Sequence, residues 1–124
     1  MSLIAIVDDL FFAVRIRETA RRAGVEIEVL PSARLGDRTA LGGIDAVILD
    51  LSVSSALDVL RALKSAPATA SAQVIGFASH VATETIATAR AAGCDQVLAR
   101  SAFVRQLPDL LRTLAAPGDA VRSR

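Results

Sequence analysis

The sequence lacks several features that mark specialised classes of protein. It has no Trp, no Tyr and a single cysteine, Cys94, among 124 residues. A lone cysteine cannot form an intrachain disulfide, so we expect a reducing compartment, the cytoplasm. No apolar run approaches the roughly 20 residues that a membrane-spanning helix needs, and no basic segment with a cleavage site opens the chain. These absences predict a cytoplasmic protein with no membrane partner.

An excess of charge of one sign is also missing. Fourteen Lys and Arg side chains balance thirteen Asp and Glu, which gives a formal net charge of +1. That balance gives no reason to expect nucleic acid as a partner. Hydrophobic residues are abundant instead, at 52% of the chain. This size and composition predict one compact domain over residues 1–116, followed by a flexible tail at 117–124.

Two hydrophobic periodicities alternate along the chain. Short apolar or alternating runs predict strands, and stretches with apolar residues at helical spacing predict helices between them. The predicted strands are 2–7, 25–30, 45–51, 73–79 and 95–100. The predicted helices are 10–23, 54–64, 82–92 and 102–115, with a short helix or irregular turn at 32–43. Pro108 should either start the main body of the last helix or kink it.

Regular alternation of strands and helices is typical of a parallel sheet with crossover helices on both faces. The second strand differs from the others, because Val25, Ile27 and Val29 alternate with Glu26 and Glu28. A strand with one face exposed to solvent is expected at the edge of a sheet. We therefore predict an α/β fold, a doubly wound five-stranded parallel sheet of the flavodoxin-like type with strand order 2-1-3-4-5.

Polar side chains gather where the predicted strands end. They comprise three carboxylates, a hydroxyl and a guanidinium: Asp8, Asp9, Asp50, Ser79 and Arg100. Ligands bind outside the carboxyl ends of the strands in such a sheet, so these groups should converge. Two adjacent carboxylates after a buried strand repel each other unless a cation lies beside them. Carboxylates suit Mg²⁺ as ligands, and a carboxylate such as Asp50 can attack phosphorus as a nucleophile.

Each of these signals also has an ordinary structural explanation. Asp-Asp pairs often start helices, where a carboxylate accepts hydrogen bonds from free amides. Arg100 alone is typical of a surface side chain with its stem on apolar residues. The joint placement of three acids in one predicted sheet is what favours a functional pocket.

Four segments together carry a family resemblance. They are VDD (7–9), the apolar strand that ends in Asp50, VIGFASH (74–80) and VLARSAF (97–103). In this order, and over essentially the whole chain, they resemble a response-regulator receiver domain.

The resemblance assigns roles to individual residues. It implies that Asp50 is the phosphoacceptor, that Asp9 binds Mg²⁺ directly and that Asp8 acts through water. The backbone carbonyl of Ser52 would complete the metal's protein ligands, which would leave the Ser52 side chain unconstrained. Ser79 and Arg100 would contact the phosphoryl group.

The sequence also departs from the family's pattern. Arg100 and Ser101 occupy the positions of the usual lysine and proline, and arginine is not equivalent to lysine. At the end of the fourth strand, where the family has a hydroxyl, alignment of the apolar positions alone puts Ala78, and a shift of one residue puts Ser79. We favour Ser79, because its hydroxyl can donate to a phosphoryl oxygen. Val97 stands where the family usually has an aromatic residue on the fifth strand.

The resemblance implies a single-domain response regulator of a two-component phosphorelay, and not an enzyme. A histidine kinase or phosphotransfer protein would phosphorylate Asp50, and a downstream protein target would recognise the altered surface. A homodimer is a further option. The alternative is a receiver-shaped interaction module that phosphorylation does not switch, to which Arg100 and Val97 point. A flavin-binding function is disfavoured because no glycine-rich loop follows the first strand.

Overall fold

The computed structural model describes residues 3–35, 43–52, 55–67, 69–78 and 83–115. Within them, the strands are β1 (Leu3–Ile6), β2 (Glu28–Leu30), β3 (Ala46–Asp50), β4 (Gln73–Ala78) and β5 (Gln96–Ala99). The helices are α1 (Leu10–Ala23), α3 (Ala56–Ser65), α4 (Thr83–Ala91) and α5 (Arg100–Ala115), with a 3₁₀ turn at Ser32–Arg34. The predicted tail at 117–124 lies outside the described residues.

The strands form one parallel sheet in the order β2-β1-β3-β4-β5. This confirms the predicted doubly wound, flavodoxin-like α/β fold. The second strand lies at the sheet edge, as its alternation predicted, but it is shorter than expected. Gly24 ends α1 with a positive φ of 73°, and the Val25 amide still donates to the helix carbonyl of Ala20. The chain therefore enters β2 only at Glu28.

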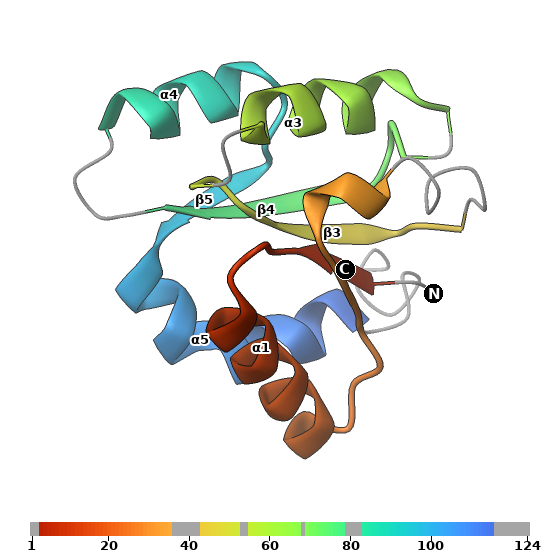
Figure 1. Ribbon diagram of the computed structural model, residues 1–124, viewed down its shortest axis with the longest axis vertical. Coiled ribbons are helices and arrows are strands. Elements are labelled where there is room, and N and C mark those ends of the chain that lie inside the picture. The colour runs from red at the N-terminus through yellow and green to blue at the C-terminus, as the bar shows by residue number, and fades with distance from the viewer. Residues whose placement is uncertain (1–2, 36–42, 53–54, 68, 79–82, 116–124) are drawn as a thin grey trace, which may run out of the picture.

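Helices cover both faces of the sheet (Figure 1), with α1 and α5 on one side and α3 and α4 on the other. Each face has its own apolar cluster, because successive residues of a strand point to opposite faces. In β3, Val47 and Leu49 belong to one cluster, and Ala46 and Ile48 belong to the other. No helix in the described part of the chain is both long and apolar enough to span a membrane.

The face covered by α1 and α5 is centred on three phenylalanines. Phe12 of α1, Phe77 of β4 and Phe103 of α5 lie with ring centroids 4.3–5.8 Å apart. The last helix begins at Arg100, two residues earlier than predicted, so Arg100 is helical and does not belong to the preceding strand. It continues through Pro108, which therefore does not start the helix.

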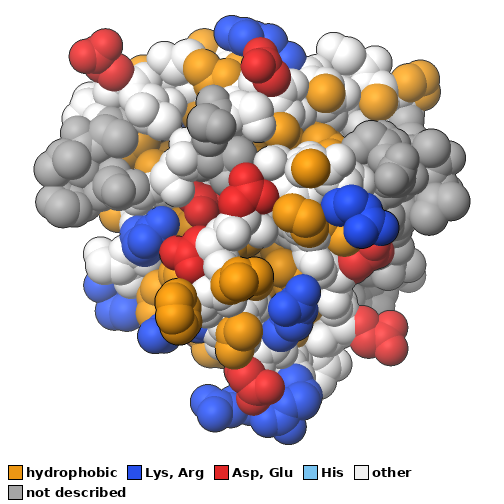
Figure 2. Space-filling view, in the orientation of Figure 1, with side chains coloured by type: hydrophobic (Ala, Val, Ile, Leu, Met, Phe, Trp, Pro, Cys, Tyr) orange, Lys and Arg blue, Asp and Glu red, His pale blue; other side chains and the backbone are white. Residues whose placement is uncertain are grey.

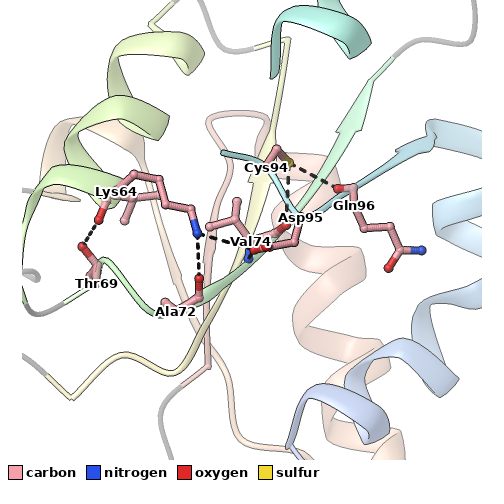
Figure 3. Close-up of polar contacts among 8 residues, drawn as sticks. Lys64, Thr69, Ala72, Val74, Cys94, Asp95 and Gln96 are labelled. Carbon is pink, nitrogen blue, oxygen red and sulfur yellow. Dashed lines mark hydrogen bonds and ion pairs between the residues drawn. The ribbon is translucent and has the colours of Figure 1, made fainter. Parts of the chain in front are cut away.

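A polar cluster joins α3 to the amino ends of β4 and β5 (Figure 3). Lys64 lies 3.5 Å from the Asp95 carboxylate and donates to the carbonyl of Ala72. Asp95 in turn accepts a hydrogen bond from the Val74 amide at 2.7 Å. Burial raises the pKa of the neighbouring Cys94 thiol, which makes it a packing residue rather than a reactive one. The cluster lies at the amino-terminal end of the strands, opposite to the end that carries Asp50, and joins α3 to β4 and β5 there.

We expect Gly76→Ala to lower the free energy of unfolding by about 1–3 kcal/mol, as overpacking of a core usually does. A Cβ atom at Gly76 would lie 2.9 Å from Leu51 Cδ1 and 3.0 Å from Cys94 Sγ, too close for van der Waals contact. Urea denaturation measures the change. In the double variant Gly76→Ala/Leu51→Val, the combined loss should be less than the sum of the two single losses. An unchanged unfolding midpoint for Gly76→Ala would contradict this packing.

Candidate functional site

The three predicted acids, Asp8, Asp9 and Asp50, lie at the same, carboxyl-terminal end of the sheet. β1 and β3 are neighbours, with Ile6 paired to Leu49, so Asp50 and the Asp8–Asp9 pair emerge at the same carboxyl-terminal edge. This is the point where the strand order reverses, and ligands bind there in open α/β sheets. Acidic side chains gather in the middle of the face shown in Figure 2, with hydrophobic and basic side chains beside them.

Asp50 is the buried acid of the site, with only 2% of its surface exposed. Its Oδ1 accepts two hydrogen bonds from Ser52, one from the amide at 2.9 Å and one from the hydroxyl at 2.6 Å. The expectation that the Ser52 side chain is unconstrained is therefore wrong. An acid two residues before a hydroxyl residue is the spacing of a local side-chain turn, so this contact had a sequence signal. No described residue donates to Asp50 Oδ2.

Asp9 has the ordinary role given above as the alternative for such pairs. It is the N-cap of α1, and its Oδ1 accepts hydrogen bonds from the amides of Phe11 (2.9 Å) and Phe12 (3.2 Å). Those amides have no partner within the helix, so the cap stabilises its first turn. No hydrogen bond from the described residues reaches Asp9 Oδ2.

Asp8 ties the end of β1 to the segment that follows β2. Its Oδ1 accepts from the Ser32 amide at 2.8 Å and its Oδ2 from the Ser32 hydroxyl at 2.9 Å. Both Asp8 and Asp9 are exposed to solvent. Solvent exposure and these hydrogen bonds lower the cost of placing the two carboxylates side by side, and the cation expected beside them stays a prediction.

The Mg²⁺ ion predicted from the sequence needs oxygen ligands at this site. No three Asp, Glu, His or Cys side chains among the described residues lie close enough together to hold a metal. Magnesium, however, binds in proteins through one or two carboxylates and keeps several waters. Asp9 and Asp50 each retain one carboxylate oxygen without a hydrogen bond from the described residues. The free oxygen of Asp9, the carboxylate of Asp50 and the carbonyl of Ser52 are ligands of the type and number that Mg²⁺ accepts.

Arg100 lies at the start of α5, with its guanidinium carbon 5.2 Å from the centroid of the Phe12 ring. Its Nε is buried and has no hydrogen-bond partner within the described parts of the chain. The structure therefore places the arginine on an aromatic ring of α1, a contact that no sequence signal indicated. The predicted contact of Arg100 with a phosphoryl group concerns the phosphorylated protein and stays a prediction.

The predicted hydroxyl residue, Ser79, lies outside the described residues. The alternative position, Ala78, ends β4 and packs in the apolar cluster that α3 and α4 cover. Asp50 is paired with Phe77, whose ring lies in the cluster on the other face. Because adjacent residues of a strand point to opposite faces, Ala78 points away from the face that Asp50 and Phe77 share.

The sequence matches no protein-family model and no curated protein. The fold, in contrast, recurs among solved structures. A putative response regulator from Chloroflexus aurantiacus J-10-fl aligns with a TM-score of 0.80 at 17% identity, over 94% of this chain and 98% of that one. A Mn²⁺-bound form of the response regulator Rcp1 aligns with a TM-score of 0.75 at 10% identity, over 93% and 94% of the two chains.

A third structure is that of an atypical orphan response regulator, described as having a phosphorylation-independent regulatory mechanism. It aligns with a TM-score of 0.72 at 17% identity, over 93% of this chain and 95% of that one. At these identities the likeness is one of fold. This protein has the fold of response-regulator receiver domains, as the sequence resemblance predicted.

We expect Asp9→Ala to lower the free energy of unfolding by about 1 kcal/mol, the usual value of an N-cap. Asp9→Asn should leave it nearly unchanged, because asparagine caps a helix as well as aspartate does. Urea denaturation of the two variants beside the wild type measures both effects. Equal losses in the two variants would show that the charge of Asp9, and not its cap, stabilises the fold.

Proposed function

We propose that this protein is a receiver of two-component phosphorelay signalling, in which Asp50 accepts a phosphoryl group with the help of Mg²⁺. One observation carries the proposal. Asp50 is a buried carboxylate at the point where the strand order reverses, with Oδ1 held by Ser52 and Oδ2 without a hydrogen bond from the described residues. The likeness in fold to response regulators supports the same function.

The chemistry follows from how Asp50 is held. Two hydrogen bonds from Ser52 fix the orientation of the carboxylate, so Oδ2 is the oxygen that attacks phosphorus. A P–O bond to Asp50 forms as the bond from phosphorus to the donor's leaving atom breaks. A bound Mg²⁺ would neutralise negative charge on the transferred group. In our proposal Asp9, Asp50 and the Ser52 carbonyl hold the ion, Asp8 acts through water, and Ser79 donates to a phosphoryl oxygen.

The partners we propose are a histidine kinase or phosphotransfer protein as the donor and a protein target that recognises the phosphorylated surface. A donor has to bring its phosphohistidine up to Asp50, so its docking surface has to adjoin the acidic site. Leu10 and Phe11 follow Asp9 directly, Val14 lies one turn further along α1, and the three are 80%, 91% and 55% exposed. We propose that this apolar surface of α1 contacts the donor.

We also propose that the protein acts in the cytoplasm. It would signal by contact with its protein target and not as an enzyme.

One observation favours the second candidate, a receiver-shaped interaction module that phosphorylation does not switch. Arg100, at the position of the family's lysine, lies on Phe12 and makes no hydrogen bond through its buried Nε within the described residues. A structural neighbour of similar fold is an atypical response regulator with a phosphorylation-independent mechanism. Whether Asp50 accepts a phosphoryl group therefore distinguishes the receiver from the unswitched module.

We expect intact-mass spectrometry to detect one phosphoryl adduct after incubation with acetyl phosphate and Mg²⁺. Asp50→Asn, which lacks the nucleophile, and a metal-free sample should remain unmodified. Asp9→Asn should give less adduct at limiting Mg²⁺, because it keeps the helix cap and loses a metal ligand. A sample with beryllofluoride, a phosphoryl analogue, guards against rapid hydrolysis. If there were no adduct and neither Mg²⁺ nor beryllofluoride raised the melting temperature, the unswitched module would be the better account.

We expect Phe11→Ser to slow phosphotransfer from an autophosphorylated histidine kinase of the same organism by about tenfold, the effect of losing one aromatic anchor from an interface. Its rate with acetyl phosphate should not change, because Phe11 is 91% exposed and lies outside the acidic site. Arg61→Ser, an exposed substitution on α3 at the opposite face, is the control. An equal slowing with both phosphodonors would show that Phe11 acts on the site itself and not on docking.

A further inference from the structure

Arg100 is an unusual residue because it is always charged and yet part of it is buried without a polar partner. Its guanidinium carbon lies 5.2 Å from the Phe12 centroid, within the range of a cation–π interaction. Its Nε is excluded from water and accepted by no oxygen of the described residues. A buried donor without an acceptor costs free energy, so a better partner would draw the guanidinium away from the ring.

The ring that holds Arg100 is fixed in place and belongs to the acidic site. Phe12 is only 7% exposed, and its amide donates to Asp9. Its ring lies 4.8 Å from that of Phe77, the residue paired with Asp50 in the sheet. The guanidinium therefore lies on an aromatic cluster that includes Phe77 of β4, the strand beside the one that carries Asp50. Arg100 itself is in the first turn of α5, and its long side chain can adopt other rotamers.

We propose that Phe12 holds Arg100 in a parked position in the unphosphorylated protein, and that Arg100 leaves the ring to bind the phosphoryl group on Asp50. This inference rests on the proposed function, because it requires that Asp50 be phosphorylated. A guanidinium can form two parallel charge-assisted hydrogen bonds with a phosphoryl group. These bonds are stronger than a cation–π contact and would give the Nε an acceptor. The change involves rotamers only, and no further covalent bond forms or breaks.

The parked position gives a physical reason for arginine in place of the family's lysine. A guanidinium is planar and weakly hydrated, so it stacks well on an aromatic face, whereas an ammonium is compact and strongly hydrated. Parking also competes with binding of the phosphoryl group. Removal of the ring should therefore raise the affinity for a phosphoryl analogue by about two- to fivefold, the worth of a modest cation–π contact. Phe12 would thus be a positioning residue that sets how readily the site closes.

The test is nuclear magnetic resonance of the Arg100 side chain, with Mg²⁺ and beryllofluoride as the probe. Protons over the face of an aromatic ring are shifted upfield, so the Arg100 side-chain protons should be upfield-shifted in the free wild type. The shift should vanish in Phe12→Leu and persist in Phe103→Leu. Phe103 belongs to the same cluster, but the cation–π contact of Arg100 among the described residues is with Phe12. Saturation with beryllofluoride should abolish the shift in the wild type but not in Asp50→Asn.

Each outcome decides the inference. An Arg100 signal without an upfield shift in the free wild type overturns it, and this measurement needs no variant to fold. A shift that persists when beryllofluoride saturates Asp50 also overturns it, while the proposed function survives. Equal beryllofluoride affinities for the wild type and folded Phe12→Leu would show that parking does not compete with binding. Failure of beryllofluoride to bind the wild type at all would instead overturn the proposed function, and this inference with it.

Discussion

The burial of Asp50 is the constraint on which the rest of the site depends. A carboxylate removed from water is costly unless hydrogen bonds replace the lost solvent. The two donors of Ser52 satisfy Oδ1, and they come from the residue two positions along the same chain. The carboxylate is therefore held by a neighbouring residue of its own chain segment and does not depend on a distant element for these hydrogen bonds. What the described residues leave unsatisfied is the second oxygen, and this is the atom through which a ligand would bind.

The surrounding acids serve the fold and the site together. Asp9 uses one oxygen to start α1, and Asp8 uses both of its oxygens to hold the segment after β2 against the end of β1. These bonds fix the backbone that carries the two carboxylates. At the opposite end of the strands, Lys64 and Asp95 fix α3, β4 and β5 in a similar way. Side-chain contacts thus hold described residues together at both ends of the strands.

The fold and the positions of the acids could be predicted because they depend on local signals. The edge position of β2, and with it the strand order, followed from the alternation of apolar and acidic residues. The limits of α1 followed from a capping acid at Asp9 and a glycine at Gly24. Contacts between distant side chains could not be predicted in this way. Ser32 reaches Asp8 across 24 positions of sequence, and Arg100 reaches Phe12 because α5 begins directly after β5. Such contacts depend on how helices pack, which periodicity does not encode.

The position of one side chain, Arg100, bears on both candidate functions. In the unphosphorylated state they share one structure, with Arg100 on Phe12 and Asp50 held by Ser52. A ligand can shift this arrangement only by its difference in affinity for the two positions of the arginine. If a phosphoryl group on Asp50 attracts the guanidinium more strongly than the ring does, the chain is a switch. If the ring holds it more strongly, Arg100 stays on Phe12 and any response to phosphorylation has to come from other residues. The strength of one cation–π contact therefore sets whether Arg100 takes part in a switch, and phosphorylation of Asp50 decides between the two functions.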